Sequence, residues 1–240
     1  MSKRVAIVLL TWQRINNLKN TLNQLSLQTN KEFDVYISNA NTNPDKIATI
    51  QKYINHFVRL NIVLLNEDNE KYTFRRLLLG RDLAKAGYEI VLYIDDDVSI
   101  APNHVQECLD QYEPKTYKSS YAWSFNNGGK SYYKNRERRV DNEKTIHYCG
   151  TGIAMLDSSI FLEDGLFDYP DGALKIEDLW LSYYAQHVMG WKLKYMKTGS
   201  IINGKDQFAL FREVQRDSIN KDVFLKTLLE LGWDLGPQDF

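Results

Sequence analysis

The sequence has 240 residues, of which 43% are hydrophobic, enough to bury the core of one large α/β domain. Its net charge of −1 argues against a protein that binds nucleic acid by general attraction to phosphates. Two cysteines, Cys108 and Cys149, are too few for a disulfide scaffold and match no metal-ligand spacing, so we expect both to be reduced and buried, as in a cytoplasmic protein.

Short apolar runs alternate with amphipathic stretches through the first hundred residues. The run at residues 5–10 (VAIVLL) is too short to span a membrane, and it is typical of a strand buried on both faces. The order strand–helix–strand predicts a parallel sheet whose ligands bind at the carboxyl ends of its strands. The predicted strands are 5–10, 33–38, 61–65 and 89–94, and the predicted helices are 16–28, 45–58 and 73–86.

Beyond residue 100 the pattern is less regular. No Pro/Gly/Ser-rich linker interrupts it, so the simplest interpretation is one domain with a short tail. The polar, basic residues 130–144 are expected to form a loop or hairpin. The other predicted elements are helices at 102–112, 176–189 and 222–231, strands at 119–125 and 192–196, and strand-like pieces within 146–156.

Three consecutive aspartates, Asp95, Asp96 and Asp97, follow the fourth predicted strand. Their repulsion and partial desolvation must be offset by a cation or by strong hydrogen-bond donors. Mg²⁺ or Mn²⁺ commonly takes one or two carboxylates with substrate phosphates and waters. Because residues i and i+2 of a strand point to the same side, Asp95 and Asp97 are expected to face one metal ion. Alternatively, Asp97 only caps the helix near Pro102.

The residues around this aspartate run resemble a known family. Residues 89–102 (EIVLYIDDDVSIAP) look like the strand and Asp-x-Asp motif of glycosyltransferase family 2, in which a proline commonly follows seven positions after the first Asp, as Pro102 follows Asp95. Residues 8–14 (VLLTWQR) resemble the family's first strand and turn. Arg75, Arg76 and Gly80 look like its Ala-Arg-Asn-x-x-Gly segment, with the spacing shifted by a residue or two.

The resemblance implies a GT-A fold, with a mostly parallel central sheet flanked by helices and a smaller sheet region on the acceptor side. Residues 1–100 would be the half that binds a nucleotide sugar, 101–205 the acceptor half, and 206–240 a C-terminal helical tail. The stretch KIEDLWLSYYA, followed by GWKL, also looks like compact stand-alone glycosyltransferases of large DNA viruses.

The implied activity is metal-dependent transfer of a hexose or pentose from a nucleotide sugar to a hydroxyl acceptor, with Mn²⁺ or Mg²⁺ as cofactor. In this reading Asp97 binds the metal and Asp95 contacts both the metal and the nucleotide. Asn39 stands where the family usually has an Asp that reads uracil, so UDP remains the expected nucleotide with weaker support. The other residues expected on the donor side are Thr11, Arg14, Arg75, Arg76 and Asp96.

Glu177 and Asp178 stand at the start of a predicted helix. An inverting transfer needs a base to take the proton of the acceptor hydroxyl. The pair resembles the Glu-Asp pair of the family, which implies that Asp178 is the base and Glu177 its helper. The alternative is that two acidic residues simply stabilise the first turn of a helix.

The acceptor side is expected at Gly150, Thr151, Gly152 and Trp180. The glycines either allow a ligand to approach the backbone or mark a bend. The basic residues 130–139 form either a solvated loop or a lid over the diphosphate. Asn203 or Asp206 would complete the metal shell.

Two other functions are open to the sequence. A catalytically silent sugar- or nucleotide-binding module would have the same fold, although intact Asp95, Asp97 and Asp178 argue against it. A nucleotidyltransferase that makes sugar nucleotides would carry a glycine-rich loop after the first strand, and residues 11–14 (TWQR) contain no glycine.

Overall fold

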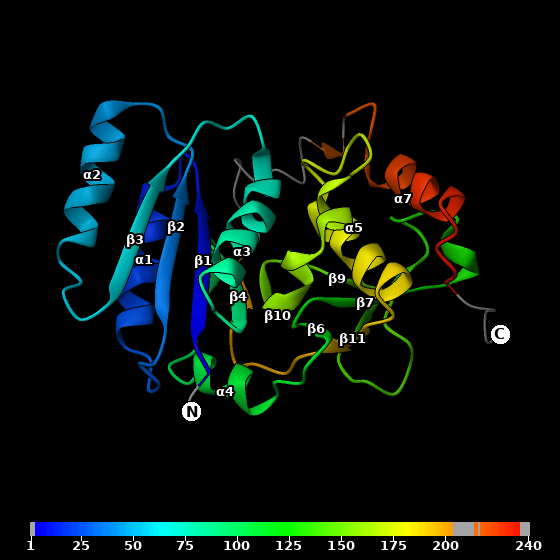
Figure 1. The fold of residues 1–240 in the computed structure, drawn as a ribbon, viewed down its shortest axis with the longest axis horizontal. Helices are drawn as coiled ribbons and strands as arrows, with labels where there is room; N and C mark the ends of the chain where they lie inside the picture. Colours follow the sequence, from blue (N-terminus) through cyan, green and yellow to red (C-terminus); the bar gives the residue numbers. More distant parts are fainter. Residues whose placement is uncertain (1–2, 204–213, 216, 236–240) are drawn as a thin grey trace.

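A computed structural model describes residues 3–203, 214–215 and 217–235 (Figure 1). Its central sheet has seven strands in the order β11-β6-β10-β4-β1-β2-β3. β10 is antiparallel to both of its neighbours, and every other adjacent pair is parallel. The strands are β1 (Val5–Thr11), β2 (Asp34–Asn39), β3 (Asn61–Asn66), β4 (Ile90–Asp95), β6 (Thr116–Ser119), β10 (Ile153–Asp157) and β11 (Lys192–Tyr195).

The helices lie on both faces of this sheet (Figure 1). They are α1 (Ile15–Ser26), α2 (Pro44–Ile54), α3 (Arg75–Lys85), α4 (His104–Asp110), α5 (Glu177–Tyr183) and α7 (Lys221–Glu230). A short 3₁₀ turn, η1 (Tyr72–Phe74), precedes α3, and a π-helical turn, η5 (Tyr184–Val188), continues α5. The predicted parallel α/β sheet is therefore confirmed.

Alternate residues of the strands supply two separate cores, because successive side chains of a strand point to opposite faces. Ile7 and Leu9 of β1 pack with α1, α2 and α4 on one face. Ala6 and Val8 pack with α3, α5 and α7 on the other. The continuous apolar run in β1 is explained by burial on both sides.

A smaller antiparallel sheet, in the order β8-β7-β9, lies beside the large one. It consists of β7 (Ala122–Phe125), β8 (Arg136–Arg139) and β9 (Tyr148–Cys149). A third, two-stranded sheet pairs β5 (Val98–Ser99) with β12 (Ile201–Ile202). The expected smaller sheet is confirmed, and the basic stretch contributes the strand β8.

The single strand predicted at 119–125 is wrong, since β6 and β7 belong to different sheets. Strand β6 ends at Ser119, and the hydroxyls of Ser119 and Ser120 both donate hydrogen bonds to backbone carbonyls. Ser119 Oγ donates to the carbonyl of Gly150 (2.6 Å), and Ser120 Oγ donates to that of Met196 (2.9 Å). Side-chain bonds of this kind compete with the strand ladder.

Cys108 and Cys149 are both free and buried, as expected. They lie in the cores on opposite faces of the central sheet, so they cannot bond to each other. Within the described ranges, no helix is both long and apolar enough to cross a bilayer.

Candidate functional site

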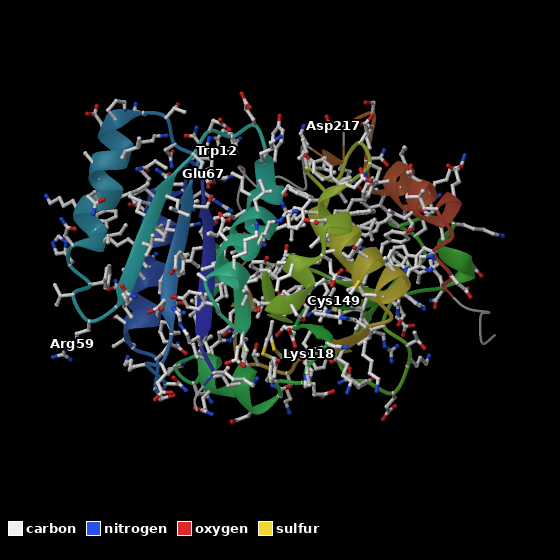
Figure 2. The ribbon with its side chains drawn as sticks, viewed as in Figure 1. Trp12, Arg59, Glu67, Lys118, Cys149 and Asp217 are labelled. Carbon is white, nitrogen blue, oxygen red and sulfur yellow. The ribbon has the colours of Figure 1, made fainter. Side chains whose placement is uncertain are left out.

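Polar residues line the carboxyl edge of the parallel strands. The register places Thr11 of β1 beside Asn39 of β2, and Asn39 beside Asn66 of β3, while Leu10 is paired with Asp95 of β4. Trp12 and Glu67, which follow β1 and β3, mark this edge in Figure 2. The Asp run and the end of the second strand thus lie on one edge, where the topology places ligands.

Asn39 is buried and its amide is held by neighbouring amides. Its Nδ2 donates to Asn66 Oδ1 (2.9 Å), and its Oδ1 accepts from Asn41 Nδ2 (2.7 Å) and the Asn41 backbone N–H (3.1 Å). The hydroxyl of Thr11, beside it, is buried without a hydrogen-bond partner in the described structure. The amide network fixes the orientation of Asn39, and its contact with a nucleotide stays a prediction.

The three aspartates have different surroundings. Asp95 Oδ1 lies 3.0 Å from Arg76 Nη2, and its side chain is 33% exposed. Asp96 is buried and its Oδ1 lies 2.5 Å from Arg14 Nη2, while Asp97 Oδ2 lies 3.3 Å from Arg14 Nη1. Arg14 therefore contacts the Asp run directly, and Asp96 points into the protein instead of toward the open edge.

Burial raises the pKa of Asp96 to about 8, with Arg14 opposing the rise and the neighbouring carboxylates adding to it. Burial and the charge of Asp95 also raise the pKa of Asp97. Negative charge is thus incompletely compensated in this run, which favours a cation nearby.

The donor set fits a divalent ion with few protein ligands. Asp97 Oδ1 is buried and has no hydrogen-bond partner among the described residues, and Asp95 on the same segment has a partly exposed carboxylate. No group of three His, Cys, Asp or Glu able to hold a metal exists in the part of the chain that the structure describes. Mg²⁺ and Mn²⁺ fit such a site because substrate phosphates and waters supply their remaining ligands.

Asn203, one expected third ligand, lies beside the Asp run. Its backbone N–H donates to the carbonyl of Asp97 (2.9 Å), and its side chain is bonded to Ser99. Asp206, the other expected ligand, lies outside the described residues.

Arg76 connects the Asp run to the Glu-Asp pair. Its Nη2 lies 3.0 Å from Asp95 Oδ1, its Nη1 donates to the Thr151 carbonyl (3.1 Å), and its Nε lies 3.2 Å from Glu177 Oε1. Burial alone would lower the pKa of Arg76, but the charges of Asp95 and Glu177 raise it above its ordinary value. Arg75 points the other way and donates to Ser38 Oγ (2.8 Å).

Glu177 is buried and its carboxylate is fully engaged. It accepts hydrogen bonds from the hydroxyls of Thr73 and Thr151, besides its ion pair with Arg76. Burial raises the pKa of Glu177, while Arg76 opposes this rise. Thr151 thus contacts both Glu177 and Arg76, and its contact with an acceptor stays a prediction.

Asp178 is held by two residues that sequence reasoning missed. Lys221 Nζ lies 2.8 Å from Asp178 Oδ2 and 3.1 Å from its Oδ1, and the Tyr148 hydroxyl donates to Oδ2. Burial alone would raise the pKa of Asp178, but the Lys221 charge outweighs it and lowers the pKa below its ordinary value. Lys221 is 43 residues away in sequence, in the first turn of α7, and no local motif points to this contact.

A family model described as "Glycosyl transferase family 2" matches residues 6–165, which include the Asp run and the Gly150–Gly152 segment. The chain belongs to glycosyltransferase family 2. The comparison with curated protein sequences returns no match.

Solved glycosyltransferase structures share the GT-A fold of this transferase at low identity. A mannosyltransferase from Pyrobaculum calidifontis, in complex with GDP-Man and Mn²⁺, is 13% identical with a TM-score of 0.60 over 97% of this chain. GalNAc-T7 with UDP, GalNAc and Mn²⁺ is 12% identical, with a TM-score of 0.57 over 80% of this chain. S. aureus TarS 1–349 with UDP is 14% identical, with a TM-score of 0.55 over 82% of this chain. The chain covers 70%, 41% and 59% of these three structures, respectively.

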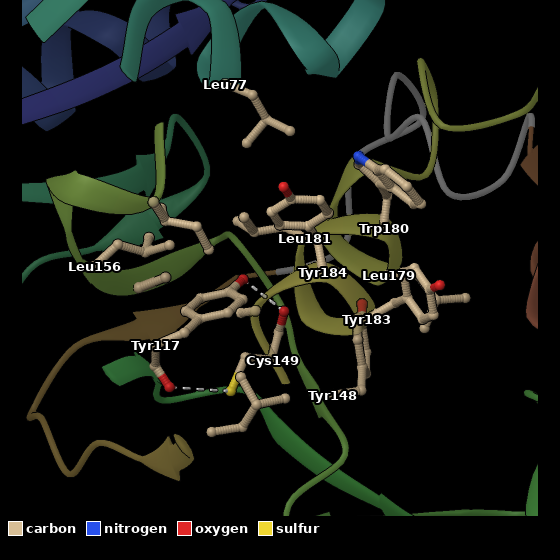
Figure 3. Close-up of a cluster of buried hydrophobic side chains, with 14 of the residues drawn as sticks. Leu77, Tyr117, Tyr148, Cys149, Leu156, Leu179, Trp180, Leu181, Tyr183 and Tyr184 are labelled. Atoms are coloured by element: carbon tan, nitrogen blue, oxygen red, sulfur yellow. Dashed lines mark hydrogen bonds between the residues drawn. The ribbon is translucent and has the colours of Figure 1, made fainter. Parts of the chain in front are cut away.

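Trp180 of the transferase is not placed as a sugar platform. It is only 4% exposed, and its indole N–H donates to the carbonyl of Leu166 (2.8 Å). Its ring lies in the core among aromatic and aliphatic side chains (Figure 3). Trp180 is close to Asp178 in sequence, but it lies on the apolar face of α5, which packs into the core.

The two glycines of the acceptor segment have different roles. A Cβ at Gly152 would lie 2.9 Å from Asp95 Oδ2 and 2.6 Å from Ile202 Cδ1, whereas a Cβ at Gly150 would lie 3.5 Å from Tyr121. The Gly152 carbonyl also accepts the backbone N–H of Asp95 (2.9 Å). Gly152 therefore allows the close approach of β10 to the Asp run, and Gly150 is not required for it.

The substitution Gly152→Ala should lower the free energy of unfolding by about 1–3 kcal/mol, because the new methyl overlaps Asp95 and Ile202. Gly150→Ala is the matched control and should have a smaller effect, since its methyl meets only ordinary contacts. Urea denaturation of both variants measures the difference. Equal losses would show that Gly152 is not closely packed against Asp95.

Proposed function

We propose that this transferase moves a hexosyl or pentosyl group from a UDP-sugar to a hydroxyl acceptor, with inversion at the anomeric carbon. The observation that carries the proposal is the Arg76 bridge, which places the Asp run on one side of a buried guanidinium and the Glu177–Asp178 pair on the other. A nucleotide on the strand edge and an acceptor near α5 would then meet across this bridge.

On the donor side, Asp97 and Asp95 would hold Mn²⁺ or Mg²⁺. When bound, such an ion acts as a Lewis acid and neutralises charge on the departing nucleoside diphosphate. The orphaned Asp97 Oδ1 supports this role, as does the presence of Mn²⁺ with GDP-Man or UDP in the similar structures. Thr11 and Asn39 would lie along the nucleotide at the ends of β1 and β2.

On the acceptor side, Asp178 would accept the proton of the attacking hydroxyl. The positive charge of Lys221 favours the ionised carboxylate, which a general base requires at neutral pH. Tyr148 and Lys221 fix the orientation of the carboxylate. Glu177 would help indirectly, by holding Arg76 and through it Asp95.

The donor half is tested by a thermal-shift screen of UDP, GDP, CMP and dTDP, each with and without Mn²⁺. UDP with Mn²⁺ should raise the melting temperature, since a ligand that binds only the folded state stabilises it. Asp97→Ala should abolish this shift, and Asp171→Ala, which removes an exposed carboxylate, should preserve it. If no nucleotide shifts the transition under either condition, the donor proposal is wrong.

The base is tested with Asp178→Asn. Transfer should fall by about 100-fold or more, because a positioned general base contributes at least that much. The metal-dependent thermal shift with UDP should remain, since Asp178 does not contact the Asp run. Radiolabelled UDP-sugars report both transfer and donor hydrolysis. A wild-type chain that binds UDP but consumes no donor would instead be a silent binding module.

The Lys221→Met variant should change the pH dependence of transfer. Lys221 lowers the pKa of Asp178, so its removal should raise that pKa and move the acid limb of kcat/KM upward by roughly one unit. In this variant Asp178 keeps its other ionisable neighbours, which are Tyr148, Tyr132, Glu177 and Arg76.

The matched control is Lys226→Met, which removes an exposed lysine of the same helix and should leave the profile unchanged. Rate profiles across the acid range give the comparison. A slower Lys221→Met enzyme with an unshifted acid limb would mean that Lys221 only supports the fold.

A further inference from the structure

One face of the small sheet carries a row of aromatic and arginine side chains. Trp123 of β7 is paired with Arg138 of β8 on one side and with Tyr148 of β9 on the other, so all three point to the same face. Tyr121 and Arg136 lie two residues along from Trp123 and Arg138, respectively, and share this face. We call Tyr121, Trp123, Arg136 and Arg138 the arginine–aromatic row.

The two guanidiniums of the row lie over aromatic rings. Arg136 lies 4.5 Å from the ring centroids of both Trp123 and Tyr132, and Arg138 lies 3.8 Å from that of Tyr121 and 5.4 Å from that of Trp123. Stacking restricts a guanidinium and leaves its N–H edge free to bind a planar anion. Because both guanidiniums lie over the Trp123 ring, a ligand on this face would meet the arginines before the indole.

Neither arginine of the row forms an ion pair with a described carboxylate. Arg136 donates to the Tyr132 hydroxyl (2.6 Å), and Arg138 donates to the Ser120 carbonyl. By contrast, Arg139 points to the other face and is paired with Glu137 and Asp141 at 3.1 Å each. The Nε of Arg138 is buried and has no hydrogen-bond partner in the part of the chain that the structure describes. Two positive charges therefore remain for an anion.

The row borders the proposed base. Tyr148, its neighbour across β7, donates a hydrogen bond to Asp178. Tyr132 connects Arg136 to Lys221, whose Nζ lies 3.4 Å from the tyrosine hydroxyl.

The row also borders the Asp run. The carbonyl of Tyr121 accepts the N–H of Gly150 (2.8 Å), and the Tyr121 hydroxyl accepts the N–H of Ile202 (3.2 Å), which packs against Gly152. At the other end of the same face, Phe125 is covered by Trp233, so the open part of the face is the row itself.

We propose that Arg136 and Arg138 form an anion-binding subsite for the acceptor, which is therefore a hydroxyl compound that carries a carboxylate or a phosphate. This inference rests on the proposed function in one respect, the role of Asp178 as the acceptor's base. β8 is paired with β7 along its whole length, so the arginines are fixed on the face that also carries Tyr148, the hydrogen-bond partner of Asp178.

The test is equilibrium binding of glucose, glucuronate and glucose 6-phosphate, measured by calorimetry without nucleotide. At least one anionic sugar should bind about tenfold or more tightly than glucose, and the carboxylate and phosphate probes identify which anion is preferred. The double variant Arg136→Gln/Arg138→Gln should lose this preference. Arg59→Gln removes an exposed arginine at the far end of the sheet and should keep it (Figure 2).

Arg138→Lys provides a variant that retains the charge in case the double variant does not fold. It should weaken the preference without abolishing it, because lysine lacks the planar fork. Equal binding of all three sugars by the wild type, or an unchanged preference in a folded double variant, would overturn the proposal. So would a double variant that loses affinity for UDP with Mn²⁺ but keeps its anion preference, since the arginines would then serve the donor. Because the sugars are tested without nucleotide, failure of the donor proposal is seen separately.

Discussion

The buried guanidinium of Arg76 links the Asp run to the Glu177–Asp178 pair and limits how the two can lie relative to each other. It contacts Asp95 at the end of β4 and Glu177 at the start of α5, elements that are far apart in the chain. A buried charge is tolerated only when its partners are well placed, so the bridge constrains both ends at once. Glu177 is adjacent to Asp178, and the position of one therefore limits the position of the other.

Local patterns were sufficient for the parallel part of the fold. The continuous apolar run of β1 and the Asp run after β4 are features of single segments, and both were placed correctly. The break between β6 and β7 was missed because it depends on the hydroxyls of Ser119 and Ser120, whose carbonyl partners come from distant segments. The alternation of apolar and polar residues within one segment cannot predict hydrogen bonds to distant segments.

The candidate site shows the same limit. The sequence predicted Asp95, Asp97 and Asp178 as site residues by their order and residue type, and their roles stay predictions. It did not identify Lys221, because a lysine in the first turn of a C-terminal helix has no feature that points to a carboxylate 43 residues earlier. Trp180 was expected at the acceptor since it follows Asp178 closely, but the helix turns it into the core. Closeness to Asp178 in sequence therefore did not predict the direction in which the Trp180 side chain points.

β8 lies at the edge of its sheet, and among the described residues no strand pairs with the outer side of its backbone. Exposed strand edges can pair with strands of other molecules and so lead to aggregation. The sequence of β8, RERR, places a charged side chain at every position of this short strand, and charged side chains on an edge strand disfavour pairing with another molecule because they would have to be desolvated. Charge on this strand therefore also helps to keep separate molecules of the transferase from joining edge to edge.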